Sequence, residues 1–386
     1  MSIEMFTDQI RGQDEALALI EAALKTGHLG HAYLFHGPAG VGKTRAALHF
    51  ARALLCEHPG AEGAPCGSCA SCGAVLDLRH PDLQLLVPLP SFTSEGRTER
   101  QAEEARSEAR AKILERFARD PFFLPVFAKP AMLSVEDLAR AKQFLSLTAQ
   151  RDGGRKVLIV KRAEAMTLPA AHAFLKILEE PQPRRVLILC ARQVRGLLPT
   201  IASRCLRVRF RPLATDFIAS VLSKSRGVPA PIARAAGATA LGSLGRALQL
   251  FEQPLDGAGK EPLDAGEFSR VRELALDLFA HPRTAGIAGP LRKGRLERDR
   301  SRFLAAVSLA LHYYRDVLRL RILGDGTQLA HEDLRREAAA DARAIATAEV
   351  TRRVRVLEEI AAAVQSNVTI PYAVASAQHR MGIGPQ

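Results

Sequence analysis

The sequence predicts an α/β fold in which a parallel sheet carries helices on both faces and is followed by helical regions. Three observations support this prediction. Short apolar runs alternate with amphipathic or charged stretches over the first 210 residues, a pattern typical of parallel sheets. A glycine-rich loop follows the first of these runs. After Pro212 the strand-like runs disappear, and the remaining sequence has helical periodicity.

Five apolar runs are the candidate strands of this sheet. Short apolar runs between helical patterns are typical of strands that are buried on both faces. The runs are AYLF (32–35), LQLLV (83–87), VLIV (157–160), VLILC (186–190) and LRVRF (206–210).

Two helices between these runs have clear boundary signals. Ser134 begins SVED, a capping-box pattern in which Asp137 stands three residues later. Thr167 can cap the next helix, Pro169 fits its first turn, and Pro181 marks its end. Later in the chain, Leu304, Val307, Leu311, Tyr314 and Leu318 recur at helical spacing and predict one long helix.

The chain divides into three predicted parts. Residues 1–212 form the sheet domain, with a cysteine cluster at 56–72 and a charged insertion at about 91–130. Residues 213–255 form a small helical unit, and residues 265–386 form a larger helical region. The Pro- and Gly-rich stretch QPLDGAGKEPLDAG separates the last two parts, as expected of a linker.

Two charged segments have no clear function. Residues 95–120 mix acidic and basic side chains without an apolar stripe, which favours a solvated helix held by weak ion pairs. The basic segment RKGRLERDRSR (292–302) could contact DNA phosphates or an acidic partner, but such runs are most often solvated.

The overall charge favours polyanionic partners. Lys and Arg number 54 against 41 Asp and Glu, which gives a formal net charge of +13 and favours nucleic acid among other polyanions. The N-terminus lacks the pattern of a signal peptide, and no apolar run reaches the length of a membrane helix. We therefore expect a cytoplasmic chain without a membrane partner.

The segment GPAGVGKT matches the phosphate-binding loop pattern G-x-x-x-x-G-K-[ST]. An apolar run precedes it and a helical pattern follows it, as this loop requires. Its glycines let backbone N–H groups surround phosphates, its lysine reaches the β- and γ-phosphate oxygens, and its threonine hydroxyl can bind magnesium. The candidate nucleotide-binding residues are Gly37, Gly40, Gly42, Lys43 and Thr44.

Four of the six cysteines lie within 17 residues: Cys56, Cys66, Cys69 and Cys72. Disulfides are rare in a reducing cytoplasm, so clustered thiols favour a metal site. The spacing C-x9-C-x2-C-x2-C favours a structural zinc knuckle with four thiolate ligands. An iron–sulfur cluster and free thiols are the alternatives. Cys190 and Cys205 lie in strand contexts and are expected in the core.

With these motifs, the chain resembles bacterial replicative clamp-loader subunits of the AAA+ class. The resemblance rests on the phosphate loop, the cysteine cluster after it, HAFLKILEEPQP (172–183) and PTIASRC (199–205). It covers residues 1 to about 252 and is weak beyond them, where only helical character and YYRDVL (313–318) are suggestive. HPDL (80–83) and the altered end of the strand at 157–160 resemble the delta-prime type of DNA polymerase III rather than the gamma/tau type.

The resemblance implies a fold and site residues. It implies an AAA+ domain with an inserted zinc knuckle, a small helical lid domain and an all-α collar domain that assembles with other subunits. In Ser203-Arg204-Cys205 it implies that Arg204 is an arginine finger that reaches into a neighbouring subunit's ATP site. An arginine supplied in this way stabilises charge on the γ-phosphate during hydrolysis.

Three departures from the pattern of an active ATPase predict that this chain hydrolyses little or no ATP. Lys161 and Arg162 stand where the family carries the Asp-Glu pair that holds magnesium and orients water. Ala191 stands at or beside the position where the family carries its polar first sensor. Gly245 replaces the sensing arginine, and Arg246 is one residue out of register.

Nucleotide binding can survive these losses. Lys43, Thr44 and the loop amides can still hold ATP or ADP, because anion binding needs only the loop and the helix N-terminus. The charges argue against Mg²⁺. Glu164 is the nearby carboxylate that could replace the lost pair, although it lies beyond the strand end.

The sequence thus predicts a delta-prime-like, largely non-hydrolysing stator of the DNA polymerase III clamp loader. It would work in a hetero-oligomer with gamma/tau-type and delta-type subunits, and through that complex with the sliding clamp and primed DNA. Two alternatives stay open. The intact phosphate loop permits an active gamma/tau-type ATPase, and the net charge permits a stand-alone, nucleotide-dependent DNA-binding protein.

Overall fold

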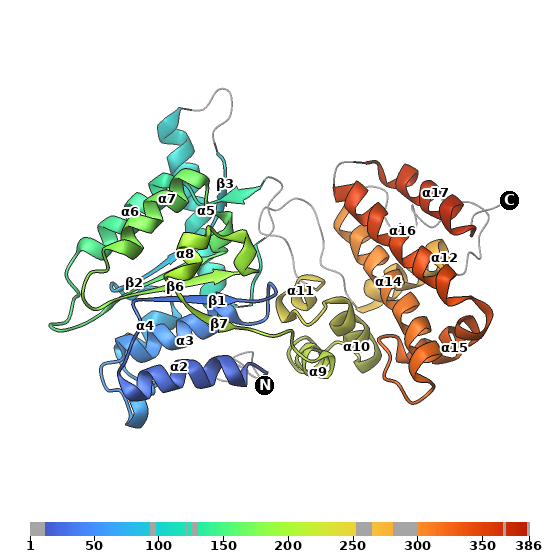
Figure 1. Ribbon diagram of the computed structural model, residues 1–386, viewed down its shortest axis with the longest axis horizontal. Helices are drawn as coiled ribbons and strands as arrows, with labels where there is room; N and C mark the ends of the chain where they lie inside the picture. The colour runs from blue at the N-terminus through green and yellow to red at the C-terminus, as the bar shows by residue number, and fades with distance from the viewer. Residues whose placement is uncertain are drawn as a thin grey trace. The chain divides into compact units, whose positions relative to one another are not determined.

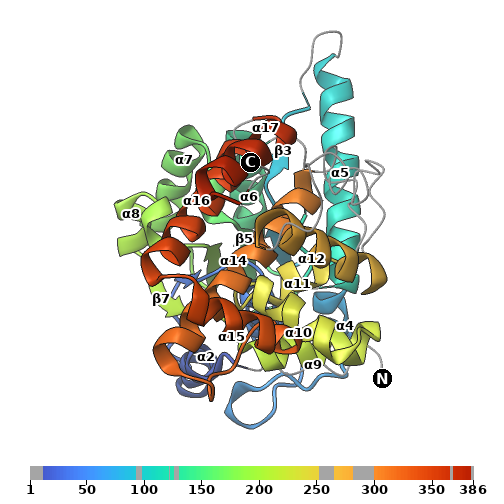
Figure 2. The same cartoon turned by 90° about the vertical axis from the view of Figure 1, so that its right-hand side faces the viewer.

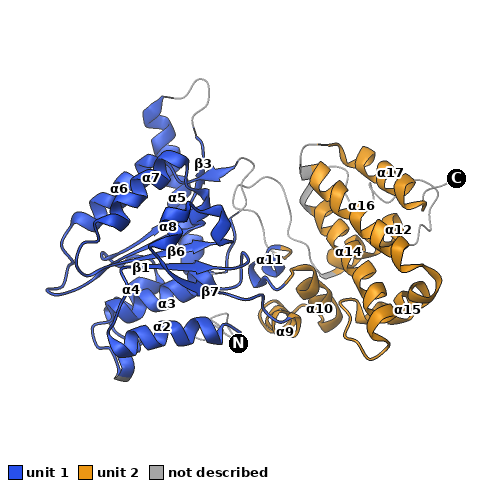
Figure 3. Ribbon diagram, viewed as in Figure 1, with its two compact units in different colours: residues 1–214, 242–249, 253–260 blue, residues 215–241, 250–252, 261–386 orange. Residues whose placement is uncertain are grey.

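The computed structural model describes residues 12–92, 98–120, 122–125, 130–251, 265–280, 300–365 and 368–383. The chain forms two compact units (Figure 3). One comprises residues 1–214, 242–249 and 253–260, and the other residues 215–241, 250–252 and 261–386. The predicted separation of a lid from a collar stays a prediction, and the linker at 253–266 lies almost entirely outside the described residues.

The first unit is built on a five-stranded parallel sheet with the strand order β2-β5-β6-β1-β7 (Figure 1). All five predicted strands are confirmed. They are β1 (Ala32–His36), β2 (Leu83–Leu86), β5 (Lys156–Lys161), β6 (Arg185–Ala191) and β7 (Leu206–Arg209).

The apolar runs form strands because both faces of the sheet are covered. Along β5, Val157 and Ile159 enter one core cluster, whereas Leu158 and Val160 enter the other. This alternation follows from the two-residue period of a strand. The parallel pairing places the carboxyl ends of β1, β5 and β6 together at one edge of the sheet.

Helices cover the two faces of the sheet in separate sets (Figure 1). On one face lie α2 (Asp14–Thr26), α3 (Lys43–Leu55) and α4 (Ala70–Leu76). On the other lie α6 (Val135–Ser146), α7 (Leu168–Glu179) and the short α8 (Pro199–Ser203). A two-stranded antiparallel sheet joins β3 (Leu89–Pro90) to β4 (Ala131–Met132).

The predicted helix caps are confirmed. Ser134 accepts from the Asp137 amide, and the Asp137 carboxylate accepts from the Ser134 amide, so the capping box is complete. The Thr167 hydroxyl accepts from the Ala170 amide at the start of α7, and proline occupies the first turn.

The charged insertion forms α5 (Glu99–Arg119), a long helix that is easily followed in Figure 2. The expectation that it is merely solvated is wrong. Ile113 and Phe117 are 1% and 0% exposed and belong to the same core cluster as α3. These two apolar residues stand four apart among charged neighbours, so their sequence gives only a weak helical stripe. Residues 95–97 of the segment lie outside the described part.

In the described residues of the second unit, all regular secondary structure is helical. Its helices are α9 (Thr215–Arg226), α10 (Ala230–Thr239), α12 (Ala265–Phe279), α14 (Arg300–Leu323), α15 (Arg335–Ala344), α16 (Thr347–Gln365) and α17 (Ile370–Met381). The predicted long helix is confirmed as α14. Of the residues at helical spacing, Val307 and Tyr314 are buried, whereas Leu304, Leu311 and Leu318 are half-buried. The helix contacts α12, α15 and α16, which bury more than one stripe.

Of the basic segment 292–302, only the last three residues are described. There Arg302 is buried and pairs with Glu267 at 3.0 Å, so it is not a solvated charge.

In the described residues, no helix has the length and apolar character needed to cross a membrane.

Candidate nucleotide site, arginine finger and cysteine cluster

The predicted phosphate loop connects β1 to α3 at the carboxyl edge of the sheet. Gly42 caps α3 with a φ of 106°, in the left-handed region that favours glycine. The first turn of the helix therefore points its free N–H groups toward the space above β1, where an anion is stabilised. The Gln13 side chain, which sequence reasoning missed, donates to the carbonyl groups of Val41 and Arg211 and ties the loop to the chain after β7.

Lys43 is folded back over the loop. Its Nζ donates to the Gly37 carbonyl at 2.6 Å and also to the Pro38 carbonyl. Burial, with a smaller contribution from the nearby Arg192, lowers the pKa of Lys43 to about 8, although Glu164 acts in the opposite direction. A bound phosphate would exchange neutral carbonyl partners for a charged one, which favours the protonated lysine.

A cavity opens beside the loop and brings several predicted residues together. Its walls come from the phosphate loop, the ends of β5 and β6, the segment after α5, and α11 (Leu244–Gln249). The polar residues that line it are Lys43, Thr44, Lys161, Arg162, Glu164, Arg192, Arg246 and Gln249. The loop glycines Gly40 and Gly42, together with Cys190 and Ala191, also line it.

Lys161 is the last residue of β5, and its side chain is buried. Its Nζ donates to the Phe123 carbonyl at 3.2 Å and lies 3.4 Å from the centre of the Phe117 ring. Burial lowers the pKa of Lys161 to about 7, with a further contribution from the positive charge of Lys43. Phe117 and Phe123 therefore attach the insertion helix to this cavity, a link that the sequence alone did not indicate.

Glu164 is the one acidic residue among the described residues that line the cavity. One oxygen of its carboxylate accepts from the Arg192 amide at 3.3 Å, and the other lies 3.7 Å from the Arg192 guanidinium without a hydrogen bond. Arg162, in a left-handed conformation at φ 51°, and Arg192 both line the cavity. The positive side chains around this single carboxylate disfavour Mg²⁺.

Gly245 has no room for the sensing arginine of an active site. A Cβ there would lie 2.6 Å from the Phe122 carbonyl oxygen and 3.0 Å from the Gly40 Cα. The Gly245 amide donates to the Gly40 carbonyl at 3.0 Å, so α11 closes directly on the phosphate loop. Arg246, although one residue out of register, does line the cavity.

Arg204 lies away from this cavity, at the end of α8. Its side chain is 39% exposed and pairs with Glu179, at the end of α7, at 3.0 Å. It also donates to the Thr200 carbonyl at 3.1 Å. An exposed ion pair of this kind contributes little to stability, so the guanidinium can exchange Glu179 for another anion. Glu179 was missed because a pair between two helix ends leaves no spacing signal in the sequence.

The four predicted cysteine ligands converge. Their sulfur atoms all lie within 4.8 Å of one another. Two pairs, Cys56 with Cys69 and Cys66 with Cys72, are 3.9 and 4.0 Å apart, close to the separation of about 3.8 Å for thiolates around tetrahedral zinc. The amides of Ser68 and Cys69 lower the pKa of Cys66 to about 6, which favours the thiolate. The cluster could therefore bind a metal.

A phosphate loop after the first strand of a parallel sheet, with helices on both faces, defines a P-loop domain. The family model of the DNA polymerase III delta subunit matches residues 12–214, more than half of the chain. The chain belongs to this family, and the predicted resemblance to its delta-prime type is confirmed by curated relatives.

Those relatives include the DNA polymerase III subunit delta' of Pseudomonas aeruginosa, which is 40% identical over 46% of this chain and 42% of that protein. The delta' subunit of Bacillus subtilis is 30% identical over 52% of this chain and 48% of that protein. The gamma/tau subunit of Mycobacterium bovis is 29% identical over 56% of this chain and 30% of that protein. The chain thus matches somewhat less than half the length of the two delta' relatives.

Among solved structures, a DNA polymerase III gamma subunit-related protein of Thermotoga maritima aligns with 95% of this chain and 99% of that one. The TM-score is 0.42 and the identity 14%.

Proposed function

We propose that this chain is a delta-prime-type accessory subunit of a bacterial replicative clamp loader. It would form a hetero-oligomer with gamma/tau-type and delta-type subunits, and that complex would load the sliding clamp onto primed DNA. Membership of the family and the relatives named delta' and gamma/tau support the proposal. In this complex the chain acts as a stator. Its Arg204 reaches a neighbour's ATP site, while the nucleotide site of this chain does not hydrolyse ATP.

The observation that carries the proposal is the position of Arg204. Among the described residues it does not line the chain's own cavity; it is exposed and contacts Glu179 and the Thr200 carbonyl. An arginine in this position is accessible to a nucleotide bound by another subunit. A finger supplied in trans stabilises the charge that develops on the γ-phosphate.

The chain's own cavity supports the proposal that this chain does not itself hydrolyse ATP. Lys161 and Arg162 stand where a hydrolytic site needs carboxylates, and Glu164 is engaged by Arg192. Glu164 is thus the one carboxylate among the described lining residues, and it lies beside a guanidinium rather than at the strand end where magnesium and water would be held. We therefore expect no ATP hydrolysis by the isolated chain.

The metal at the cysteine cluster is proposed to be zinc. Four thiolates close the coordination sphere and leave no open position for a substrate, which is typical of a structural site. Cys56 follows the end of α3, and Cys72 lies in α4, so the ion would join these two helices.

The test is ATP turnover by a complex reconstituted with gamma/tau-type and delta-type subunits, the clamp and primed DNA. Arg204→Ala should abolish hydrolysis at one neighbouring site, with a rate loss there of about 1000-fold or more. Arg204→Lys should rescue it poorly, because an ammonium group cannot form the bidentate contact. Arg207→Ala, an exposed arginine on β7, is the matched control. Unchanged turnover with Arg204→Ala in a complex of normal size would refute the finger role.

The alternative is an active gamma/tau-type ATPase, which the intact phosphate loop favours. It predicts that the purified chain hydrolyses ATP by itself and that Lys43→Ala abolishes this activity. The same preparation without other subunits decides between the two functions.

A further inference from the structure

We propose that the cavity beside the phosphate loop binds a nucleoside di- or triphosphate without a metal ion, and that the Lys161 ammonium group takes the place of magnesium. The inference concerns the chain's own site and is independent of the proposed role of Arg204. It turns the substitution at the end of β5 from a loss of function into a different way of holding the same anion.

The first step is the position of Lys161. It ends β5 and lines the same cavity as Lys43 and Thr44, the residues that approach phosphate and metal in this type of loop. Its Nζ is fixed by the Phe123 carbonyl at 3.2 Å and by the Phe117 ring at 3.4 Å. With 6% exposure, the side chain stays in the cavity rather than extending into solvent.

The second step is the number of donors on Lys161. An ammonium group has three N–H donors and no acceptor. The Phe123 carbonyl takes one of them, and the Phe117 ring lies 3.4 Å from the nitrogen on another side. One donor is therefore left for a phosphate oxygen, with which it would form a charge-assisted hydrogen bond.

The third step is the charge of the cavity. Among the described residues that line it, five are basic and one is acidic: Lys43, Lys161, Arg162, Arg192 and Arg246 against Glu164. Glu164 is already paired with Arg192. Asp120 is buried outside the lining, and its charge favours the protonated form of Lys161. A free polyphosphate carries more negative charge than its magnesium complex, so it complements this excess better.

The fourth step is the exclusion of the metal. Magnesium is bound by carboxylates, hydroxyl groups, phosphates and water in octahedral geometry. Thr44 supplies one hydroxyl, but the positions that would supply carboxylates hold Lys161 and Arg162. A divalent cation entering beside them would be repelled by these two side chains and by Lys43.

The test is equilibrium binding of ADP and of ATP to the full zinc-loaded chain, by calorimetry, once in buffer freed of divalent cations by a chelating resin before the protein is added and once in excess MgCl₂. We expect binding in the magnesium-free buffer at least as tight as in magnesium. Lys161→Met should weaken binding in the magnesium-free buffer by roughly 10- to 100-fold, the effect of losing a hydrogen bond to a charged partner. Lys161→Asp, which restores a carboxylate, should make binding depend on magnesium. Circular dichroism confirms that each variant is folded.

Lys142→Met is the matched control, because it removes the same charge from an exposed position on α6, outside the cavity. It should leave both affinities unchanged. Three results would overturn the proposal: no nucleotide bound in either buffer, binding that requires magnesium in the wild-type chain, or metal-free binding that Lys161→Met does not weaken. None of these results bears on Arg204, so they are distinguishable from failure of the clamp-loader function.

Discussion

At the residue scale, the chemistry of the nucleotide cavity depends on Lys161. A positive charge at the end of a buried strand is visible in the sequence, and the structure places it in the lining of the cavity. The contacts that fix the charge come from Phe117 and Phe123, some 40 residues earlier. No local pattern links these positions, because tertiary packing alone brings them together.

Replacing Lys161 should change stability in a pH-dependent way. Burial lowers the pKa of Lys161 to about 7, and the side chain is faced by Cys190, Lys43, Asp120 and Arg162. The folded chain therefore holds fewer protons than the unfolded chain above that pH. Burying the charged lysine therefore lowers the free energy of unfolding. This destabilisation is largest below about pH 7 and becomes smaller as the pH rises toward the usual lysine pKa.

Lys161→Met should consequently stabilise the chain more at about pH 6 than at about pH 9. Urea unfolding at the two values measures the difference, with Lys142→Met as the control for net charge. An equal effect of Lys161→Met at both values would show that Lys161 does not titrate in this range.

Gly245 gives a second prediction at this scale. Gly245→Ala places a Cβ 2.6 Å from the Phe122 carbonyl oxygen and should destabilise the chain by about 1–3 kcal/mol. Gly326→Ala, where no atom lies within 4 Å of the added carbon, should be close to neutral. Thermal unfolding compares the two variants. A neutral Gly245→Ala would mean that α11 does not pack against the phosphate loop as described.

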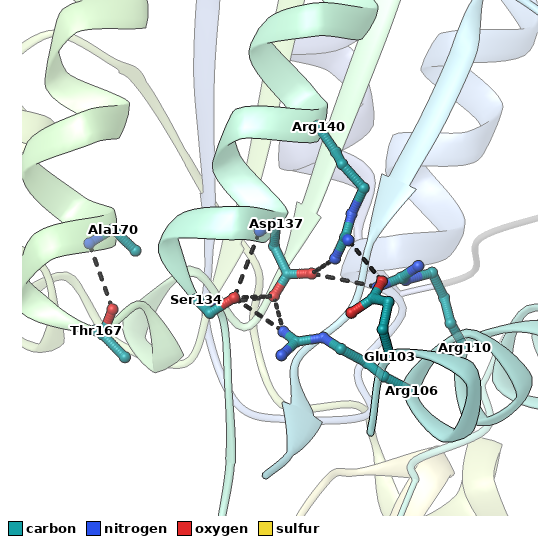
Figure 4. A network of polar contacts seen from close by, with 8 residues as sticks. All are labelled: Glu103, Arg106, Arg110, Ser134, Asp137, Arg140, Thr167 and Ala170. Atoms are coloured by element: carbon teal, nitrogen blue, oxygen red, sulfur yellow. Dashed lines mark hydrogen bonds and ion pairs between the residues drawn. The ribbon is translucent and has the colours of Figure 1, made fainter. Parts of the chain in front are cut away.

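At the element scale, the insertion helix α5 is held by a cluster of charges around Asp137 (Figure 4). Arg106, Arg110 and Arg140 all pair with this carboxylate, whose side chain is 3% exposed. Burial alone would raise the pKa of Asp137, but the Ser134 amide, Arg106 and Arg140 bring it below its usual value. The capping box was predictable from SVED, whereas Arg106 and Arg110 come from a distant segment whose charges resembled a solvated run.

Asp137→Asn should cost about 2–3 kcal/mol of unfolding free energy, since it weakens a helix cap and leaves three arginines without their shared anion. Glu115→Gln is the matched control on α5. It removes an exposed partner of Arg119 and should cost less than about 0.5 kcal/mol. Because the pKa of Asp137 is lowered in the folded chain, its contribution is present above the usual aspartate pKa and is lost as the pH falls through the lowered value. Equal costs for the two substitutions in urea unfolding would contradict the buried network.

The cysteine cluster is the second element with a testable prediction. We expect the purified chain to contain one equivalent of zinc by elemental analysis. Cys72→Ser should lose most of the zinc and lower the melting temperature by several degrees, because metal binding is coupled to folding. Cys205→Ser, which alters a buried cysteine outside the cluster, should keep its zinc. Iron in place of zinc, or a full zinc content in Cys72→Ser, would refute the assignment.

At the scale of the whole molecule, sequence and structure agree best where a local pattern determines the outcome. The five strands, the phosphate loop and the converging cysteines follow from apolar runs and fixed spacings. The error concerns packing, namely the core contacts of Ile113 and Phe117. Helical residues contact whichever neighbours the fold provides, and a single sequence does not specify those neighbours.

The central claim is that this chain acts on a neighbour's nucleotide while its own site does not turn over. The most direct measurement compares ATP turnover by the reconstituted complex when this chain carries Arg204→Ala or Lys43→Ala, with assembly checked by gel filtration. ATP turnover should fall strongly with Arg204→Ala and change little with Lys43→Ala. A large loss for Lys43→Ala with none for Arg204→Ala would identify the chain as a motor and contradict the account.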